Sequence, residues 1–417
     1  MTSHSIHLHT YAFLALPLSF LGLPLYMHLP KFYHDHYNAS LAAIGVILFV
    51  SRLLDGVIDS LLGVISDRFN FTRKKYFIVF GIGLAVSFNA FFYLPQTDSS
   101  TTTLFWFALC TVVSYFFYSL LFINYYNLGL TLTTTSSQRF NLSSFRELFS
   151  FAGILLAAVL PALMSLFYQD EIISFRLYGA IFAAFMLIGI FLISTSNVAP
   201  NIDDKQNSFD FKKILTVWAH KPMRFILLLF FINSLPVAIT SNLFNFYVDN
   251  VLGTHGQEAS LLSIYFCAAA LGAISITHFF KSPNKLTLLR QMMIASASSF
   301  SLCCFLNHDN SYLFYVVCVI SGFSLGGEFV ILPALSADIV SSKNAYSNTF
   351  FGIWASCGKV SLAVASGIFL PLVSFSDNFM ITISRQNKLI FMYAAVPLLL
   401  KCATIVFLSR RLTLNNG

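Results

Sequence analysis

Residues 48–68 read LFVSRLLDGVIDSLLGVISDR, a stretch that places charged side chains inside a long hydrophobic segment. Arg52, Asp55 and Asp59 follow the spacing i, i+3, i+7, so a helix would carry all three on one face. Ionisable groups inside a membrane-spanning helix are costly, and they usually line an ion or substrate path. The alternative interpretation is a buried structural ion network that fixes the packing of the helices.

The composition of the whole chain is that of a membrane protein. Of the 417 residues, 57% are hydrophobic and 10% are charged, whereas a soluble domain carries about 25% charged residues. A membrane-spanning helix needs about 20 apolar residues. Twelve such segments are expected, at 11–30, 41–66, 76–95, 103–132, 145–167, 174–197, 223–251, 258–280, 286–306, 311–338, 346–373 and 389–409.

The Lys and Arg residues of the loops predict the orientation of these segments. With the N-terminus in the cytoplasm, the inner loops and tails hold 17 basic residues, the outer loops hold four, and three lie within helices. The sequence therefore predicts a multi-pass protein of the plasma membrane, a bacterial inner membrane, with both termini cytoplasmic. The same distribution explains the net charge of +7, so no nucleic-acid partner is predicted.

A polar interruption near the midpoint divides the segments into two groups of six. The predicted domains are an N-terminal six-helix bundle (1–197), a cytoplasmic central loop (198–222) and a C-terminal six-helix bundle (223–417). The stretch 208–222, SFDFKKILTVWAHKP, suits either a short amphipathic helix at the membrane surface or a partly ordered linker. Six plus six segments are typical of the major facilitator fold. We therefore expect an all-α membrane protein with twelve transmembrane helices in two six-helix bundles.

A second motif directly follows the charged stripe. Gly63 and the pair Asp67-Arg68 precede a basic cluster, an order that resembles the inner-loop motif of major facilitators. Gly63 would let two helices approach closely. Asp67 would accept hydrogen bonds from helix N-termini or basic side chains and so hold an inner gate shut. We assign Gly63, Asp67, Arg68 and, near the inner end of the tenth segment, Asp338 to this predicted gate.

The stretch from Arg52 to Gly63 resembles the R-x-x-D-x-x-x-D-P-x-x-G sequence of the glycoside–pentoside–hexuronide cation symporters, a family typified by melibiose permease. In that family the two carboxylates bind the coupling cation. The resemblance therefore implies that Asp55 and Asp59 bind Na⁺ or H⁺.

Two further motifs carry the same resemblance. The sequence WASCGK, which ends at Lys359, resembles the family's G-K signature and implies a membrane-embedded lysine that acts in coupling. Arg146, in SSFRE, resembles the arginine that follows the family's inner loop, so we place it in the predicted charge network.

Several departures limit what the resemblance implies. Ser60 replaces the proline of the motif, and Asn124 stands where the third cation-site carboxylate would align. An amide oxygen coordinates a cation but brings no charge, so a sodium site would be weaker and a proton site stays open. The family's sugar-binding carboxylate is missing from the first segment, which offers only Ser19, and Leu128 replaces the stacking tryptophan. Galactoside recognition is therefore not carried over.

The carboxylate pair also makes physical sense without the family. Asp55 and Asp59 would lie about one helical turn apart, and like charges repel each other in a low-dielectric site. A cation or proton would relieve that repulsion, and Arg52 and Lys359 would do so in the empty carrier. Glu328, a lone glutamate in the tenth segment, would contact a substrate cation, carry a proton or pair with Lys359.

Polar and aromatic residues of four segments are candidates for the lining of a substrate cavity. They are Ser19, Tyr126, Asn127, Asn233, Asn242 and Trp354. Pro17, Pro24 and Pro30 predict a kinked or broken first segment, as in helices that line transporter cavities.

The predicted function is secondary active transport by alternating access, in which Na⁺ or H⁺ drives symport of a small polar solute, with a sugar or glycoside as first candidate. The alternatives are a lysolipid or other amphiphile carrier of the same fold, and a proton-coupled transporter of a non-sugar metabolite. We expect a monomer that is not an enzyme. No cofactor motif is present, so no cofactor and no metal beyond a coupling Na⁺ are expected.

Overall fold

The computed structural model describes residues 2–69, 74–94, 99–195, 211–254, 256–279, 284–341, 346–374 and 385–415. Within these ranges every regular element is a helix and none is a strand, so the all-α prediction is confirmed. The chain packs into two units. Unit 1 holds Met1–His220 and Ala337–Ser356, and unit 2 holds Lys221–Ser336 and Cys357–Gly417.

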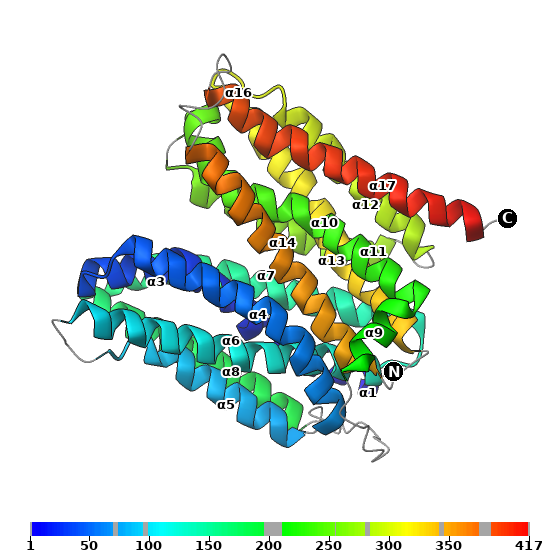
Figure 1. The fold of residues 1–417 in the computed structure, drawn as a ribbon, viewed down its shortest axis with the longest axis horizontal. Helices are drawn as coiled ribbons and strands as arrows, with labels where there is room; N and C mark the ends of the chain where they lie inside the picture. The colour runs from blue at the N-terminus through cyan, green and yellow to red at the C-terminus, as the bar shows by residue number, and fades with distance from the viewer. Residues whose placement is uncertain are drawn as a thin grey trace. The chain divides into compact units, whose positions relative to one another are not determined.

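Unit 1 is built mainly from the first half of the chain (Figure 1). Its helices are α1 (Thr2–Phe13), α2 (Ala15–Phe20), α3 (Gly22–Tyr37), α4 (Leu41–Phe69), α5 (Lys74–Ala90), α6 (Ser100–Thr131), α7 (Ser136–Phe167), α8 (Glu171–Thr195) and α9 (Lys212–Ala219). Helix α6 packs against both α4 and α5, and α8 packs against α5.

Unit 2 is built from the second half. Its elements are α10 (Lys221–Tyr247), the π-helix η1 (Val248–Leu252), α11 (Glu258–Phe279), α12 (Lys285–Cys303), the 3-10 helix η2 (Ser311–Leu313), α13 (Phe314–Val340), α14 (Ser347–Ser374), α16 (Arg385–Ile390), the π-helix η4 (Phe391–Ala395) and α17 (Val396–Asn415). The end of α13 and the start of α14 belong to unit 1.

All twelve predicted segments fall on helices. In the described part of the chain, nine helices are long and apolar enough to cross a membrane. Their apolar residues point outward as well as inward, and α4, for example, exposes Val46, Val57 and Ile58. A helix that is apolar on its outer face is stable there only in lipid, because water would make that exposure unfavourable.

The first segment is broken into three helices, and two prolines explain where. Proline has no N–H and cannot donate to the carbonyl four residues earlier. Pro17 leaves the carbonyl of Phe13 without that donor, and Pro24 does the same for Phe20. Helix α1 ends at Phe13 and α2 ends at Phe20. Pro30 lies inside α3, which continues through it.

Two tyrosines fasten the first segment to α6. The rings of Tyr11 and Tyr125 stack with their centroids 4.3 Å apart. Each hydroxyl donates to the backbone carbonyl of the other residue, at 3.0 Å in both cases. Both side chains are buried, and their hydroxyls are satisfied, so the pair fixes α1 against α6 without leaving a polar group unpaired.

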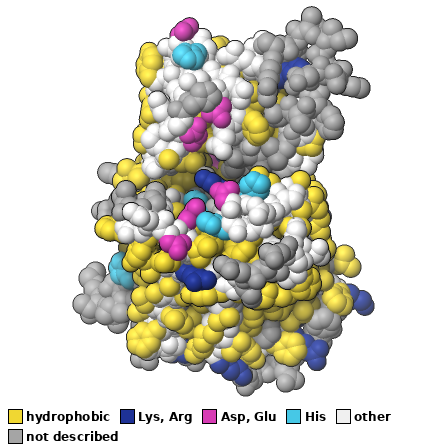
Figure 2. Space-filling model, turned by 90° about the vertical axis from the view of Figure 1, so that its left-hand side faces the viewer, with side chains coloured by type: hydrophobic (Ala, Val, Ile, Leu, Met, Phe, Trp, Pro, Cys, Tyr) yellow, Lys and Arg dark blue, Asp and Glu magenta, His cyan; other side chains and the backbone are white. Residues whose placement is uncertain are grey.

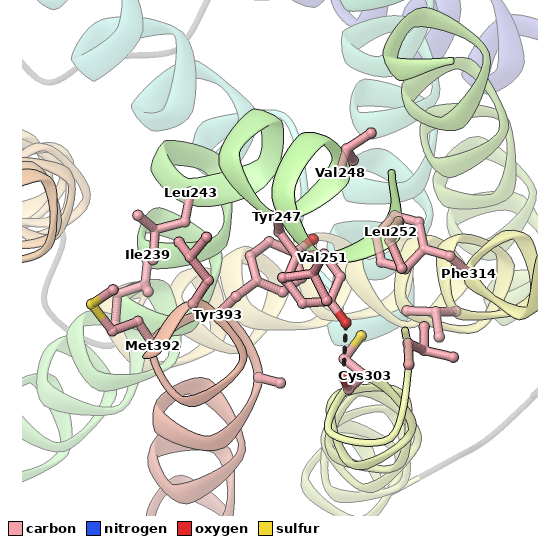
Figure 3. Packing of buried hydrophobic residues seen from close by; sticks show 14 of the residues in the cluster. Ile239, Leu243, Tyr247, Val248, Val251, Leu252, Cys303, Phe314, Met392 and Tyr393 are labelled. Atoms are coloured by element: carbon pink, nitrogen blue, oxygen red, sulfur yellow. Dashed lines mark hydrogen bonds between the residues drawn. The ribbon is translucent and has the colours of Figure 1, made fainter. Parts of the chain in front are cut away.

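Unit 2 contains a buried apolar cluster around two π-helical turns (Figure 3). Tyr247, at the end of α10, stacks on Tyr393 of η4 with a centroid separation of 4.1 Å. The hydroxyl of Tyr247 donates to the carbonyl of Cys303 at 2.7 Å. Apolar residues of η1, including Val251 and Leu252, belong to the cluster together with residues of α11, α12, α13, α14 and α16, so the two irregular turns are held by packing against most helices of unit 2.

The predicted central loop contains a helix in its described part. Of the two alternatives for residues 208–222, the structure shows the helix, α9, from Lys212 to Ala219. Phe211 and Leu215 are exposed, whereas Lys213 and Val217 are buried against the rest of unit 1. The loop residues 198–210 lie outside the described residues, and the predicted domain boundaries stay a prediction.

The basic-residue distribution gives the first testable prediction, the orientation in the membrane. In a variant without the seven native cysteines, Thr101→Cys at the start of α6 should react with a membrane-impermeant maleimide in intact cells. Lys212→Cys at the start of α9 should react only after permeabilisation, because the basic inner loops are expected in the cytoplasm. The reverse labelling pattern would show that the predicted topology is wrong.

Candidate functional site

Helix α4 carries its acids on a buried face. Asp59 is fully buried and Asp55 is 5% exposed, whereas Val57 and Ile58 between them face outward. The oxygen Oδ1 of Asp55 accepts a hydrogen bond of 3.0 Å from the hydroxyl of Ser119 in α6. Arg52, one turn earlier, is half-buried. The helical stripe predicted from the spacing thus turns two carboxylates into the interior of the protein.

Asn124 of α6 also reaches α4, but at a different level. Its amide nitrogen donates to the hydroxyl of Ser66 at 3.2 Å and to the carbonyl of Leu120 at 2.7 Å. Ser66 lies about two helical turns beyond Asp59. The amide oxygen Oδ1 is buried and accepts no hydrogen bond from any residue that the structure describes. Asn124 therefore offers an acceptor to a ligand, as a cation site would require.

Ser119 is a residue that the sequence analysis missed. It is fully buried in the apolar run YSLLFINYYN of α6. A hydroxyl in such a run is a weak signal, because serine also bonds to the backbone of its own helix and packs as a small residue. Only the arrangement of α4 against α6 shows that this hydroxyl reaches a carboxylate.

Asp67 lies at the end of α4 and contacts the first turn of α14. Its carboxylate accepts from the backbone N–H groups of Asn348 and Thr349, at 3.0 Å each, and from the Thr349 hydroxyl. The first N–H groups of a helix have no partner inside the helix, and a negative charge at that end is stabilising. The contact joins α4 to the part of α14 that belongs to unit 1. The role of Asp67 as a gate stays a prediction.

Two glycines let α4 and α14 come together beside this contact. A Cβ atom on Gly63 would lie 2.6 Å from the Asn348 carbonyl oxygen and 2.9 Å from Cα of Thr349. A Cβ atom on Gly352 would lie 2.5 Å from the carbonyl oxygen of Asp59. Any larger residue at either position would push the two backbones apart, and the helix-end contact of Asp67 depends on this close approach.

A second aspartate makes a similar contact at the start of α7. The carboxylate of Asp338, near the end of α13, accepts from Arg139 at 3.0 Å and from the Ser136 hydroxyl at 2.7 Å. A capping box between Thr135 and Gln138 begins α7 and fixes the position of both donors. The sequence analysis placed Asp338 in the gate but did not identify its partners. The other gate residue, Arg68, is exposed.

Arg146 is buried in the middle of unit 1. Its guanidinium donates twice to Oε1 of the neighbouring Glu147, at 2.9 and 2.8 Å. It also lies over the ring of Tyr126, 4.0 Å from the centroid. The Tyr126 ring in turn lies 5.6 Å from that of Phe351. Arg146 thus links a buried acid to an aromatic residue predicted to line the substrate cavity.

Glu328 has a basic partner that the sequence analysis did not identify. Lys401 of α17, to which the sequence gave no role, lies 2.7 and 2.6 Å from the two carboxylate oxygens of Glu328. Asn233 of α10 donates to Glu328 at 2.8 Å and accepts from Lys401 at 2.9 Å. All three side chains are at most 3% exposed. The amide of Asn233, predicted to line the substrate cavity, is therefore used inside this triad.

The remaining predicted residues are dispersed. Asn127 is buried with an amide oxygen that no described residue hydrogen-bonds, and Asn242 donates to the carbonyl of Ala238 in its own helix. Trp354 is buried, whereas Ser19 is half-buried. Lys359 lies on the part of α14 that packs in unit 2, so its predicted pairing with the acids of α4 would join two units and stays a prediction.

Solved structures show which fold this chain shares. The chain aligns with the fucose:proton symporter FucP of E. coli at a TM-score of 0.71 and 14% identity, covering 98% of this chain and 99% of that one. A bacterial homologue of the iron transporter ferroportin gives 0.73 and 11%, covering 98% and 99%. The human organic anion transporter MFSD10 gives 0.67 and 14%, covering 97% and 98%. The fold is that of the major facilitator transporters, as predicted.

Sequence comparison then identifies the family. The family described as "MFS/sugar transport protein" matches residues 10–416, and the chain belongs to it. The inner membrane symporter YicJ of Escherichia coli (strain K12) is 24% identical over 260 residues, which are 59% of this chain and 55% of YicJ. The uncharacterized symporter YjmB of Bacillus subtilis (strain 168) is 23% identical over 408 residues, 92% of this chain and 87% of YjmB. The predicted family resemblance is confirmed.

The glycine crossing gives the second prediction. Gly63→Ala should lower the unfolding temperature of the purified protein, because a methyl group forced against the α14 backbone costs about 1–3 kcal/mol. Gly45→Ala is the matched control on the same helix, where an added Cβ meets nothing within 4 Å. The control should leave stability unchanged or raise it slightly, because alanine favours a helix. Equal effects of both substitutions would contradict the close crossing.

The buried triad of unit 2 gives the third prediction. Removing one partner leaves an unpaired buried charge, so Lys401→Met and Glu328→Gln should each destabilise by about 3–5 kcal/mol. The double variant should be more stable than the sum of the two losses predicts, because contacting residues do not behave additively. The control cycle pairs Glu328→Gln with Arg224→Gln, an exposed residue at the start of α10. Additive unfolding energies in both cycles would argue against the ion pair.

Proposed function

We propose that this protein is a cation-coupled symporter that moves a small polar solute by alternating access. The buried pair Asp55 and Asp59 on α4 is the observation that carries the proposal. A membrane protein places two acids on one buried helical face only at considerable cost, and that cost is offset when a cation or proton binds there. The family's description as sugar transport and the naming of YicJ and YjmB as symporters support the same function.

The ligands available around the acids suit a monovalent cation or a proton. Asp55 and Asp59 provide charge, and the Ser119 hydroxyl provides a neutral oxygen beside Asp55. The Asn124 amide oxygen lies at the level of Ser66, further along α4, and stays a predicted third ligand. Hard cations prefer such oxygen ligands. No group of three or more His, Cys, Asp or Glu side chains among the described residues could hold a metal ion. We propose Na⁺ or H⁺ as the coupling ion and no other cofactor.

Cation binding would act on the rest of unit 1 through α4. The acids and Asp67 are on one helix, and Asp59 lies beside the crossing of α4 with α14. Neutralising the acids removes their mutual repulsion and changes the position that α4 prefers. We propose that this change weakens the contact between Asp67 and the first turn of α14, which would couple occupation of the cation site to the inner gate.

The proposed solute is a sugar or glycoside. The Arg146 guanidinium offers a charged donor, and the amide oxygen of Asn127, which no described residue hydrogen-bonds, offers an acceptor; both are chemistry that recognises sugar hydroxyls. The absence of an acid in the first segment argues against galactoside recognition by the family's usual residues. We further propose a monomer in a bacterial inner membrane, with both termini cytoplasmic, that catalyses no chemical reaction.

Transport assays in proteoliposomes test this proposal and give the fourth prediction. Wild-type protein should accumulate a labelled sugar only under an imposed Na⁺ or H⁺ gradient. Asp55→Cys and Asp59→Cys should each abolish accumulation while retaining some solute exchange, because the cation ligand is lost but the solute contacts remain. Asp35→Cys, an exposed acid of α3, is the control and should transport normally.

Accumulation by both α4 variants would show that the stripe is structural. Uptake that is the same with and without a Na⁺ or H⁺ gradient would favour the amphiphile carrier of the same fold. Movement of labelled lysolipid in place of sugars would favour it too. Accumulation of a non-sugar metabolite under a proton gradient would favour the third alternative.

A further inference from the structure

A cavity of about 420 Å³ lies in unit 1 at the end where α3 finishes and α8 begins. Helix α3 contributes His28, Lys31 and Phe32 to its walls, and α8 contributes Glu171, Phe175 and Tyr178. Figure 2 looks onto this face, where acidic and histidine side chains gather. None of the residues assigned above to cation binding, coupling, substrate or gating lines this cavity, so it needs an explanation of its own.

One wall of the cavity is aromatic and rigid. The rings of Phe32 and Phe175 lie 4.7 Å apart, and the ring of Tyr178 lies 6.2 Å from Phe175. All three are less than 10% exposed. The faces of such rings attract an ammonium group, and the attraction strengthens where the cation is shielded from water.

His28 presents a hydrogen-bond acceptor beside this wall. The carbonyl of Ala157 accepts from the Tyr178 hydroxyl at 3.2 Å and also faces a ring nitrogen of His28. A carbonyl only accepts, so the facing nitrogen carries the hydrogen. The other nitrogen, Nε2, is buried, and no residue of the described chain hydrogen-bonds it. In this tautomer Nε2 is an acceptor and is available to a donor such as an ammonium group.

Charges of opposite sign stand at the entrance. Glu171 is about half exposed, and its Oε2 lies 3.0 Å from His36, the contact that it makes among the described residues. An exposed pair of this kind contributes little stability, so the carboxylate can readily accept from a ligand. Lys31 lies one helical turn from His28, is exposed and forms no ion pair with any described residue. The cavity therefore offers two acceptors and an aromatic wall for a cation, and one ammonium for an anion.

The neighbouring surface is suited to hydrocarbon chains. Helix α7 exposes Val159, Leu163 and Phe167 at four-residue intervals along the flank that ends at the cavity. The part of α7 from Ser136 to Pro161 is a candidate membrane span. Val159 would therefore face acyl chains, while Leu163, Phe167 and the cavity lie at the end of this span, toward the level of the lipid headgroups.

We propose that this cavity binds a phosphate ester that carries a primary ammonium group, the zwitterion found in phosphatidylethanolamine. The ammonium group lies against the aromatic wall and donates to Glu171 and His28. The phosphate lies at the entrance, where Lys31 neutralises it. The same zwitterion occurs on a lipid and on the free, water-soluble headgroup, and the experiment distinguishes these two sources.

Native mass spectrometry and thermal unfolding of the purified full-length protein test the proposal. Four ligands are compared. Phosphatidylethanolamine is the proposed ligand, and glycerophosphoethanolamine is its water-soluble headgroup. Phosphatidylglycerol lacks the ammonium group, and phosphatidylcholine has an ammonium group without an N–H. Phosphatidylethanolamine should bind about tenfold more tightly than the other two lipids, the difference expected for one charge-assisted hydrogen bond. If the soluble headgroup binds about as tightly as phosphatidylethanolamine, the site exists and its ligand is a free metabolite. If only phosphatidylethanolamine binds, the ligand is the lipid.

Substitutions at the entrance make the test specific. Lys31→Gln and Glu171→Gln should each weaken phosphatidylethanolamine binding about tenfold. Both residues are exposed, so their loss should not prevent folding. Asp35→Asn, on the same helix but not lining the cavity, is the control and should bind as the wild type does. Equal affinity for all three lipids, or variants that bind like the wild type, would overturn the proposal. Because the readout is binding and not transport, its failure leaves the symport proposal unaffected.

Discussion

A charge inside the hydrocarbon layer must be paired, solvated or functional, and this constraint explains the arrangement of the buried ionisable groups in both units. In unit 2 the requirement is met by a complete triad, in which Lys401, Glu328 and Asn233 satisfy one another. In unit 1 Arg146 pairs with the adjacent Glu147 and stacks on Tyr126. The acids of α4 differ, because two like charges share one face and α6 supplies a neutral hydroxyl, that of Ser119, to Asp55. That contrast separates a group of charges that stabilises packing from one suited to bind an ion.

Backbone proximity is the second requirement, and glycine provides it. Asp67 reaches two N–H groups of α14 only because Gly63 and Gly352 let the helices cross with almost no side chain between them. Lys213 of α9 is buried nearby and acts electrostatically on Asp67. A single carboxylate thus joins the end of α4 to the start of α14. A contact made of a few polar bonds at helix ends is easier to break and reform than an apolar interface of the same extent.

The sequence predicted the helices well, because hydrophobic segments of membrane length and a 3.6-residue period are local signals. The same reasoning placed Asp55 and Asp59 on one face, and the structure buries both. The partners were less accessible to sequence reasoning. Glu328 was expected to meet Lys359 or a substrate, and only the packing of α13 against α17 shows Lys401 beside it. Ser119 and Arg139 were missed for the same reason, since the residue that faces a charge is decided by helix rotation and crossing. The family resemblance identified α4 and α14 but carried no information on α17.

The breaks in the first segment have a consequence for how this protein could change its substrate during evolution. The carbonyls of Phe13 and Phe20 lack the N–H donors that a residue other than proline would supply at positions 17 and 24, so the first segment holds main-chain acceptors at its two breaks. A main-chain acceptor is indifferent to the identity of the side chain at its own position. Substitutions at residues 13 and 20 can therefore change the side chains around the two breaks while both carbonyls remain available as acceptors. Replacement of Pro17 or Pro24 would restore the missing N–H donor and remove this availability.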